Sequence, residues 1–477
     1  MTPENKELKP AICVIGAGPG GLAVAAASAR RDVSTVLIEK GRMGGESLNR
    51  GSIPAQALIA ATERIRSMRG GEPFGIKTQR VAVDFGAVNA HVRDIVGSLA
   101  PNAARERMTG LGIEVIEGTA RFTDRYTVAV GDLTVKARRF VIATGSLPII
   151  PAIPGLFNTP YLTEETVFDL AEIPRHLIVI GAGAAGLELA QVFRRLGSEV
   201  TVLDAAAALH GSDAESAAVV LEALAREGIK LRTGIEIAKV SRALAKVRVV
   251  LGIDGGAQTI EGSHLLVAVG RQPNVEDLNL DAAGIRMTGH GIVLDKSLRT
   301  TNKSVYVVGD AAGGPKYTHV ADYHASLVIR HALFRVPVRV NYEIIPRVTY
   351  TDPELAEVGL LEEEARAYSG AIRVLRWPYR ENDRAQAKRT TEGHIKIITD
   401  RAGEILGVTI AGPGAGEAIA AWTLAITEKL NIRAMANVVV PYPSYAEVGK
   451  RAAMTYFIHG LTIPRTRRIM RWLRRMK

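Results

Sequence analysis

Cysteine is almost absent from this chain of 477 residues, which contains one thiol, Cys13. A single cysteine excludes a disulfide within the chain, a redox-active cysteine pair and a cysteine-rich zinc site. Cys13 lies between Ile12 and Val14 in an apolar segment, so we expect a buried thiol in a strand, without a redox role. The ten histidines lack the spacing of metal ligands, so we expect no metal site. Scarce cysteine also fits a reducing compartment, and we expect a cytoplasmic protein.

Aromatic residues are scarce as well, at 5%, but hydrophobic residues make up 47% and charged residues 23%. This composition excludes a disordered chain, and the length suggests about three domains. The formal net charge is +11, of which residues 461–477 supply +7 with six arginines, one lysine and no acid. The rest of the chain therefore carries too little positive charge for a nucleic-acid groove, and we expect no nucleic-acid partner.

A glycine-rich turn near the N-terminus follows an apolar strand, AICVIG, and precedes an alanine-rich helix, GLAVAAASARR. The turn reads Gly16-x-Gly18-x-x-Gly21, and the next strand, STVLIEK, contains Glu39. In this context Gly16 permits the tight turn, Gly18 lets a pyrophosphate approach the backbone, and Gly21 lets helix and strand pack closely. Glu39 can accept hydrogen bonds from a ribose diol. The pattern predicts a dinucleotide-binding unit.

The same pattern recurs as Gly181-x-Gly183-x-x-Gly186, with Asp204 ending the following strand. In both copies the first glycine lies 23 positions before the acid. Two copies in the same context predict two dinucleotide ligands. A carboxylate at Asp204 would accept from a ribose 2′-hydroxyl and repel a 2′-phosphate, and residues 205–208 are four alanines without an arginine. We therefore expect NADH rather than NADPH at this second unit.

Coarser patterns organise the remainder of the chain. We expect one helix around 87–109, strands at VIATGS and VYVVGD, and a small sheet over 229–270. From about residue 340 the pattern changes to a separate α+β domain. Its expected strands lie near 343–350, 372–379, 393–399 and 404–411, and its expected helices near 361–368 and 414–429.

Several ordered motifs give the chain a specific resemblance. They are GAGPGG, GGESLNRGSIPAQAL, VIATGSLP, GAGAAGLE, AVGRQPN, VYVVGDAA, YTDPELAEVG and YPSYAE. Together they resemble the pyridine nucleotide-disulfide oxidoreductase family, on its dihydrolipoamide dehydrogenase and mercuric reductase-like branch. The resemblance implies an α/β fold with two Rossmann-type dinucleotide-binding domains and a C-terminal α+β dimerisation domain. The implied boundaries are FAD-binding segments at 1–150 and 276–340, an NAD-binding domain at 151–275, the dimerisation domain at 341–455, and a basic tail at 456–477.

The resemblance also implies cofactor-binding roles for individual residues. FAD would be bound by Gly16, Gly18, Gly21, Glu39, Gly45, Thr144, Gly145, Gly309, Asp310 and His319. Asp310 would bind the ribityl chain, and for His319 we favour a structural or backbone role over proton transfer. The nicotinamide dinucleotide would be bound by Gly181, Gly183, Gly186, Asp204 and Gly270. Glu188 matches an acid near the flavin, and the family forms homodimers in which the C-terminal domain completes the partner's active site.

This sequence departs from the family at its redox disulfide. The two cysteines of the family motif are Ser47 and Ser52 here, and the lysine that would face Glu188 is Gln56. The catalytic histidine near the C-terminus is Tyr442, whereas the glutamate of that motif remains as Glu447. A base that serves thiol exchange has no role where hydroxyls replace thiols, and tyrosine, with a pKa of about 10, is a poor base. These four changes remove the flavin–disulfide part of the family's electron-transfer route and leave its flavin–nicotinamide part intact. The catalytic candidates at these motifs are Glu188, Gln56, Tyr442 and Glu447.

These observations favour an FAD-dependent NADH oxidoreductase, not a disulfide reductase, that passes electrons from the flavin directly to a small acceptor. A quinone is our first choice, because flavins reduce such acceptors without thiols. Two alternatives stay open, a degenerate FAD- and NAD-binding or sensing protein and a reductase that uses an external thiol. Ser47 and Ser52 could be residual polar contacts or fillers, and we favour fillers that line a cavity. Tyr442 and Tyr445 would either pack at the dimer interface or contact the acceptor.

The C-terminal tail has its own pattern. Residues 466–476 predict a short helix with one apolar stripe, and arginines occupy most of the remaining positions. The stripe consists of Ile469, Trp472, Leu473 and Met476. Such a helix can lie on an anionic membrane surface or dock on the protein body, and both interpretations stay open. The first would place the protein peripherally at the inner face of a membrane through residues 464–477.

Overall fold

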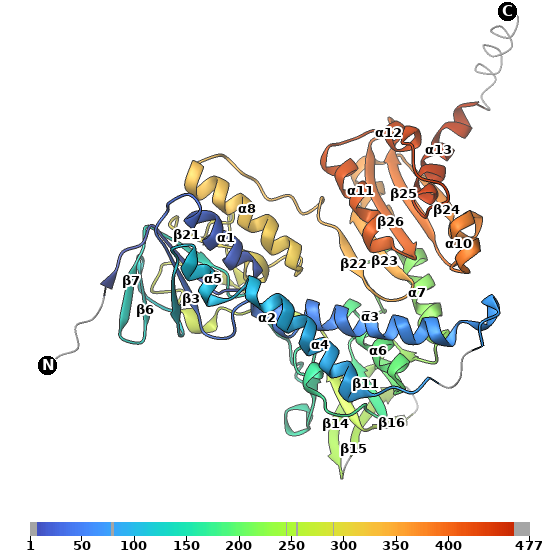
Figure 1. Cartoon of the computed structure of the whole chain (residues 1–477), viewed down its shortest axis with the longest axis horizontal. Helices are drawn as coiled ribbons and strands as arrows, with labels where there is room; N and C mark the ends of the chain where they lie inside the picture. The colour runs from blue at the N-terminus through green and yellow to red at the C-terminus, as the bar shows by residue number, and fades with distance from the viewer. Residues whose placement is uncertain (1–6, 78–80, 245, 254–255, 290, 462–477) are drawn as a thin grey trace, which may run out of the picture. The chain divides into compact units, whose positions relative to one another are not determined.

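The computed structural model describes residues 7–77, 81–244, 246–253, 256–289 and 291–461. The chain divides into two compact units, which Figure 1 shows as ribbons. The first comprises Met1–Ile180, Arg195–Ser198 and Ile237–Val340, and the second comprises Gly181–Arg194, Glu199–Glu236 and Asn341–Lys477. The expected tail helix over 466–476 lies outside the described residues. Every helix within the described ranges is too short or too polar to cross a bilayer.

The first unit is built on a five-stranded parallel sheet in the order β21-β8-β2-β3-β4. Its strands are β2 (Ile12–Ile15), β3 (Thr35–Glu39), β4 (Glu114–Glu117), β8 (Arg139–Ile142) and β21 (Val305–Val307). The strands are continuous apolar runs because both faces of the sheet are covered. One face packs against α1 (Pro19–Ala29) and α8 (Thr318–Phe334), which lie side by side in Figure 1. The other face packs against β5 (Arg121–Asp124), β6 (Thr127–Val130) and β7 (Leu133–Lys136).

Cys13 lies at the centre of this sheet. It is paired with Val36 of β3 on one side and with Phe140 of β8 on the other, and it is fully buried. Burial raises the pKa of its thiol far above the ordinary value. The expectation of a buried core thiol is therefore confirmed, and this cysteine is protected from thiolate chemistry.

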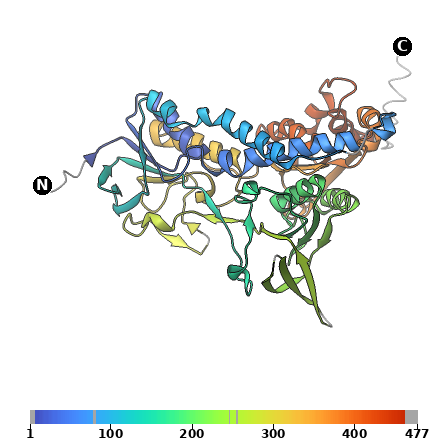
Figure 2. The same ribbon diagram turned by 60° about the horizontal axis from the view of Figure 1, so that its bottom comes forward.

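The expected single helix over 87–109 is wrong. The chain forms α4 (Phe85–Leu99), a short 3-10 turn at Ala100–Asn102 and then α5 (Arg105–Gly110). Pro101 accounts for the break, because a proline in a helix interior removes a hydrogen bond and clashes with the preceding turn. α4 runs beside α3 (Ser52–Arg69), as both ribbon views show (Figures 1 and 2).

Further strands complete the first unit. β10 (Leu162–Thr163), β17 (His264–Val267) and β11 (His176–Ile180) pair in parallel. The small sheet expected within 229–270 is confirmed as β14 (Glu236–Ala243), β15 (Lys246–Ile253) and β16 (Gly256–Gly262), in that order. β9 (Ser146–Pro148) pairs antiparallel with β18 (Arg271–Pro273), and this pairing brings Ser146 and Arg271 into the same part of the unit.

The second unit combines a nucleotide-binding element with an antiparallel sheet. The first part contains α6 (Ala184–Leu196), β12 (Glu199–Leu203), α7 (Ala214–Arg226) and β13 (Lys230–Arg232), and β12 pairs in parallel with β13. The sheet has the order β22-β23-β26-β25-β24, and α11 (Ala415–Thr427), α12 (Ile432–Asn437) and α13 (Glu447–Leu461) contribute to its core.

The expected α+β domain after residue 340 is confirmed with small shifts. The strands are β22 (Arg347–Thr349), β23 (Glu354–Gly359), β24 (Ile372–Pro378), β25 (His394–Asp400) and β26 (Ile405–Gly412), and α9 spans Glu362–Ser369. The sequence pattern did not reveal β23, which is buried along four consecutive residues and therefore shows no alternation. The α/β fold class with a C-terminal α+β domain is thus confirmed.

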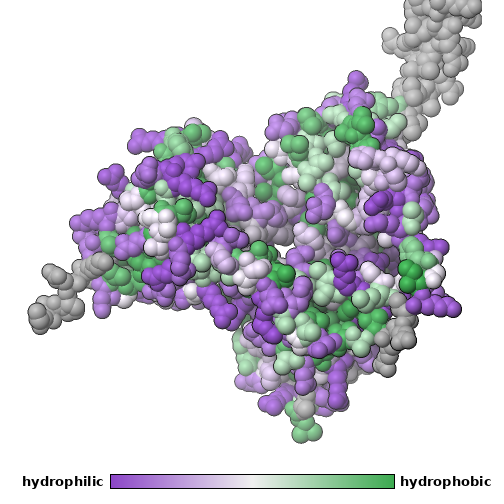
Figure 3. Space-filling view, viewed as in Figure 1, coloured by the Kyte–Doolittle hydropathy of each residue, from purple (hydrophilic) through white to green (hydrophobic). Residues whose placement is uncertain are grey.

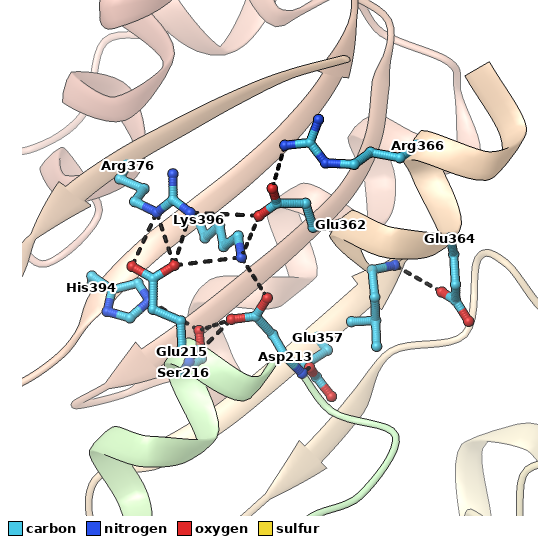
Figure 4. Close-up of polar contacts among 11 residues, drawn as sticks. Asp213, Glu215, Ser216, Glu357, Glu362, Glu364, Arg366, Arg376, His394 and Lys396 are labelled. Atoms are coloured by element: carbon cyan, nitrogen blue, oxygen red, sulfur yellow. Dashed lines mark hydrogen bonds and ion pairs between the residues drawn. The ribbon is translucent and has the colours of Figure 1, made fainter. Parts of the chain in front are cut away.

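A buried ion-pair network joins α7 to the antiparallel sheet within the second unit (Figure 4). Asp213 caps α7 by accepting from the Ser216 N–H at 3.0 Å. Lys396 of β25 is 4% exposed, and its Nζ lies 2.7 Å from both Asp213 Oδ2 and Glu362 Oε2. The hydrogen bond from Lys396 lowers the pKa of Glu362 to about 2. A buried ammonium group paired in this way makes the removal of either partner costly.

Arg376 and His394 extend the network. Arg376 Nη2 lies 2.9 Å from Glu215 Oε2, and His394 Nε2 lies 3.0 Å from Ser216 Oγ (Figure 4). Asp213, Glu215 and His394 could each offer a metal ligand atom, all within 4.8 Å of one another. Lys396 Nζ lies 2.7 Å from Asp213 and 3.5 Å from Glu215, so its ammonium group takes the place that a metal ion would need.

Candidate functional site

The first glycine-rich turn has a backbone shape that only glycines allow. Gly16 has a φ of +105°, and a Cβ there would overlap the carbonyl oxygen of Ala143. A Cβ on Gly21 would overlap the carbonyl oxygen of Gly16. A Cβ on Gly18, in contrast, would meet nothing within 4 Å. The turn between β2 and α1 is therefore tight on one side and open at Gly18, which fits the close approach of a pyrophosphate.

Glu39 closes this turn from the end of β3. Its Oε2 accepts from the Ala17 N–H at 2.5 Å, and its Oε1 accepts from the Gly41 N–H at 2.7 Å. The carboxylate is thereby fixed beside the turn, where a ribose diol would need an acceptor.

The second turn repeats this geometry in the second unit. Gly181 has a φ of +113°, and a Cβ on Gly183 would meet nothing within 4 Å. Asp204 Oδ2 accepts from the Ala182 N–H at 2.7 Å, and Asp204 Oδ1 accepts from the Ala206 N–H at 2.8 Å. The two acids, which lie 23 positions after their first glycines, therefore accept from backbone N–H groups in the same pattern. Each accepts from the residue after the first glycine and from the residue two positions after itself. Gly186 lies in the first turns of α6, as the motif requires.

Other expected FAD-binding residues lie around the first turn. A Cβ on Gly45 would lie 2.7 Å from Gly18 Cα, so the segment before Glu46 runs directly past the turn. Thr144 follows β8, and its buried Oγ1 has no hydrogen-bond partner among the described residues. Gly145 is open on its Cβ side and has a φ of +69°. An orphaned hydroxyl and open glycines beside the turn fit a bound cofactor.

The Gly-Asp pair after β21 lies in the same unit. Gly309 has a φ of +66°, and its N–H donates to His324 Nδ1 at 3.2 Å. Burial lowers the pKa of His324 to about 4, so this imidazole is neutral and can accept. Asp310 Oδ2 accepts from Ser146 Oγ at 2.6 Å. His319 lies at the start of α8, where its ring stacks on Tyr317 with centroids 5.2 Å apart.

Arg271 adds a charged cluster that the sequence did not reveal. It follows Gly270, whose φ is +111°, and it donates to Ser146 Oγ at 2.8 Å. Its guanidinium also pairs with Glu164 at 3.1 Å and with Glu165 at 2.5 Å. All three charged side chains are at most 18% exposed. Glu164 and Glu165 lie outside every motif, so the sequence gave no reason to single them out. The pairing of β9 with β18 is what brings Arg271 to Ser146 and Asp310.

Ser47 and Ser52, at the two positions where the sequence resemblance implies cysteines, share one partner. Ser47 Oγ lies 2.8 Å from Thr318 Oγ1, and Ser52 Oγ lies 3.3 Å from the same atom. Ser47 belongs to α2 (Gly45–Asn49), and Ser52 begins α3. Gln56 lies one turn further along α3 and is partly buried. The serines are thus hydrogen-bonded to the start of α8, which is more specific than the filling role that we expected.

Glu188 is the expected acid of the second unit. Its carboxyl accepts from the Tyr350 N–H at 2.7 Å. Burial raises the pKa of Glu188 to about 7, against the effect of this hydrogen bond. Glu188 therefore holds its proton more readily at neutral pH than an ordinary glutamate does. Gln56 belongs to the first unit and Glu188 to the second.

Tyr442 and Glu447 lie near each other in the sequence but have different partners. Tyr442 is 70% exposed, and its hydroxyl donates to Asp383 Oδ2 at 2.7 Å. This hydrogen bond raises the pKa of Tyr442 further, so the phenol cannot act as a base at neutral pH. Glu447 Oε1 lies 3.7 Å from Arg451, and its buried Oε2 has no hydrogen-bond partner among the described residues. Asp383 gave no signal in the sequence.

Tyr445, by comparison, is a packing residue. Its hydroxyl lies 2.8 Å from Thr390 Oγ1, and its ring meets Tyr379 edge-on with centroids 5.8 Å apart. Of the two tyrosines in this motif, Tyr442 is the one that presents its ring to solvent.

The chain is similar to known proteins along most of its length. Residues 10–325 match the family described as pyridine nucleotide-disulphide oxidoreductase, and residues 345–453 match its dimerisation domain. A mercuric reductase of Bacillus cereus is 34% identical over 447 residues, covering 93% of this chain and 71% of that protein. A dihydrolipoyl dehydrogenase of Geobacillus stearothermophilus is 33% identical over 448 residues, covering 92% and 94%. Among solved structures, a Cu(II) complex of the HOCl-induced flavoprotein disulfide reductase RclA from Escherichia coli matches with a TM-score of 0.83 and 25% identity, covering 94% and 99%.

Proposed function

Because the chain belongs to the pyridine nucleotide-disulphide oxidoreductase family, we propose that it is an FAD-dependent NADH oxidoreductase that passes electrons from the flavin directly to a small acceptor. The family binds FAD and a pyridine nucleotide. The proposal differs from the named relatives, which include disulfide reductases, in its path from the flavin to the acceptor.

The observation that carries the proposal is the pair of serines on Thr318. Hydroxyl groups have no accessible two-electron couple, so Ser47 and Ser52 cannot relay electrons as a dithiol would. The remaining thiol, Cys13, is buried in the centre of the parallel sheet. A route through sulfur within this chain therefore has no chemical basis.

In the proposed enzyme each glycine-rich turn holds one cofactor. Gly18 and Glu39 would face the ADP moiety of FAD, and Gly183 and Asp204 would face that of NADH. When bound, the cofactors supply hydride transfer from the nicotinamide to the flavin and electron transfer from the flavin to the acceptor. The chain orients the two rings. For a quinone the overall reaction is NADH + H⁺ + quinone → NAD⁺ + quinol.

A quinone is the acceptor that best fits the loss of the dithiol relay, because it accepts two electrons and two protons without a thiol. Tyr442 supports an aromatic acceptor, because its hydroxyl is held by Asp383. Its exposed ring can therefore serve as a surface on which a flat acceptor stacks. The raised pKa of Tyr442 keeps its phenol neutral.

We also propose a homodimer. The second unit carries the family's dimerisation domain and exposes several large apolar side chains. Figure 3 shows hydrophobic residues among the hydrophilic ones on the visible face of this unit. The exposed set in its C-terminal part includes Leu424 (60%), Val439 (90%), Tyr442 (70%) and Met454 (50%). Such side chains fit a surface that a second copy covers.

Anaerobic titration of the flavin-loaded protein with NADH, followed by an acceptor panel, tests the proposal. The panel contains a water-soluble quinone, lipoamide and glutathione disulfide. We expect the flavin absorbance to bleach with NADH and to return rapidly with the quinone alone. Absence of bleaching would instead identify a degenerate cofactor-binding protein. Reoxidation of the flavin that requires an added small thiol would identify a reductase that uses an external thiol.

A further inference from the structure

Four carboxyl groups surround the single guanidinium group of Arg271 in the first unit. Arg271 pairs directly with Glu164 and Glu165. It shares Ser146 with Asp310, because Ser146 Oγ accepts from Arg271 Nε at 2.8 Å and donates to Asp310 Oδ2 at 2.6 Å. Glu46 is the fourth acid, on the short helix α2. The charges of Arg271, Glu165, Asp310 and Glu164 act on the pKa of its carboxyl.

We call these five residues the Arg271 cluster, and its acids outnumber its one guanidinium group. With every acid ionised, four carboxylates would face one guanidinium group. Glu164 and Glu165 have the guanidinium as a direct partner, and Asp310 has the Ser146 hydroxyl. The carboxyl of Glu46 lies against Gly51, so closely that a Cβ on Gly51 would overlap it. Burial raises the pKa of Glu46 to about 7, with the three neighbouring acids adding to this effect and Arg271 opposing it.

Glu46 follows the residue that passes close to Gly18 of the first glycine-rich turn. Gly45 immediately precedes Glu46, and a Cβ on Gly45 would lie 2.7 Å from Gly18 Cα. Gly18 is the position at which the proposed FAD pyrophosphate approaches the backbone. A bound pyrophosphate would bring further negative charge to a cluster that already has an excess of acids.

We propose that Glu46 is a neutral carboxylic acid in the FAD complex, so that binding of FAD is coupled to protonation of this side chain. This inference rests on the proposed function, because it takes FAD as the ligand of the first turn. In its neutral form Glu46 removes one negative charge from the cluster. In its ionised form it would repel the cofactor.

The direction of the pH dependence follows from linkage. FAD binds the protonated form, and that form is lost as the pH rises through about 7 in the free protein. The dissociation constant of FAD should therefore increase about tenfold between pH 6 and pH 8. At pH 8, where most Glu46 side chains are ionised before binding, each FAD that binds should take up close to one proton.

Two measurements on the full chain test this inference. FAD is titrated into flavin-depleted protein at pH 6, 7 and 8, with binding followed by flavin fluorescence. Calorimetry at pH 8 in two buffers of different ionisation enthalpy then gives the number of protons taken up. Glu46→Gln is neutral at every pH and is the central variant. Glu63→Gln, at an exposed glutamate of α3, is the matched control.

We expect the pH effect on the dissociation constant to shrink from about tenfold to less than twofold in Glu46→Gln, and the proton uptake to disappear. The wild type and Glu63→Gln should keep both. An unchanged pH effect or proton uptake in Glu46→Gln would overturn the inference while leaving the proposed function in place. If Glu46→Gln does not fold, the wild-type proton uptake alone decides, and a value near zero would overturn it. A wild-type chain that binds no FAD would contradict the proposed function, and this inference with it.

Discussion

Ser47 Oγ lies 2.8 Å from Thr318 Oγ1, a contact between two hydroxyl groups within the first unit. Ser52 lies 3.3 Å from the same threonine oxygen. Each serine hydroxyl therefore lies within hydrogen-bond distance of Thr318, and the two contacts tie α2 and α3 to the start of α8. The serines are part of a polar contact that positions helices, which gives them a structural role independent of electron transfer.

Restoring the cysteines should not restore disulfide reduction. In the double variant Ser47→Cys/Ser52→Cys we expect activity with lipoamide and glutathione disulfide to stay below about 1% of the quinone rate. The sequence resemblance implies that Gln56 and Tyr442 still occupy the positions at which thiol chemistry needs a lysine and a base. The tyrosine hydroxyl also donates to Asp383. Steady-state assays with NADH and each acceptor measure this.

Ser47→Ala/Ser52→Ala is the control for that experiment. It removes the same hydroxyls without adding sulfur, and its quinone rate should stay within about threefold of the wild type. Wild-type turnover of lipoamide at a rate similar to that of the quinone would show that electrons reach sulfur by another route and would contradict the prediction.

Asp204 should determine the choice between NADH and NADPH. Its carboxylate is fixed by the N–H groups of Ala182 and Ala206 and stays available to a ribose 2′-hydroxyl. Hydrogen bonds to charged groups contribute about 1.5–3 kcal/mol. We therefore expect Asp204→Ala to lower kcat/KM for NADH by about 10- to 100-fold and to leave the NADPH value nearly unchanged. Glu199→Ala, at an exposed acid of β12, the strand that Asp204 follows, is the control. A preference of the wild type for NADPH would refute the assignment.

Glu188 should make the protein less stable as the pH rises. Its pKa is about 7 in the folded chain and near 4.5 in the unfolded chain. Between these values the folded state binds more protons, so the free energy of unfolding falls with increasing pH. At 1.36 kcal/mol for each pKa unit, the loss between pH 4.5 and pH 8 is about 3 kcal/mol.

The variant Glu188→Gln should abolish this contribution. Unfolding of flavin-free protein in urea at pH 5 and pH 8 measures it. The difference between the two pH values should shrink by about 2.5 kcal/mol in Glu188→Gln and stay unchanged in Glu199→Gln. If the free energy of unfolding changes equally between pH 5 and pH 8 in both variants, ionisation of Glu188 does not destabilise the folded protein.

Lys396 should be far more important for stability than the surface lysines. Its ammonium group is buried between Asp213 and Glu362, so Lys396→Met leaves uncompensated carboxylates and should cost about 3–5 kcal/mol. Lys230→Met removes an exposed pair with Glu199 at 4.0 Å and should cost less than about 1 kcal/mol. Urea unfolding of both variants compares them. Adding Asp213→Asn to Lys396→Met should recover part of the loss, and the absence of any recovery would argue against the charge-based explanation.

The sequence predicted those parts of the site that depend on local backbone shape. The turns at Gly16 and Gly181, together with Glu39 and Asp204, could be assigned because glycine spacing determines which chain conformations are possible. Glu46, Arg271 and Asp383 could not be assigned in this way. Their roles depend on contacts between segments far apart in the chain, such as Arg271 with Ser146, 125 positions away. The break at Pro101 could have been predicted, since a proline inside a helical pattern is a local signal.

The basic tail should hold the protein reversibly at an anionic membrane. Residues 464–477 combine an apolar stripe that includes Trp472 with six arginines and one lysine in residues 461–477. Each basic residue near an anionic leaflet contributes about 1 kcal/mol, which is enough for peripheral binding. Such binding would bring the flavin close to a lipid-soluble quinone. We expect full-length protein to sediment with vesicles that contain phosphatidylserine at low ionic strength, and to be released at high salt because screening weakens the attraction. A chain that ends at Leu461 should stay in solution, as should the full chain with vesicles of phosphatidylcholine alone. A full-length variant with Trp472→Ala separates the two components of binding, since it keeps the charges and should bind more weakly at every salt concentration. Equal sedimentation of the full-length and shortened chains would assign the tail to packing on the protein body and would remove this support for a quinone acceptor.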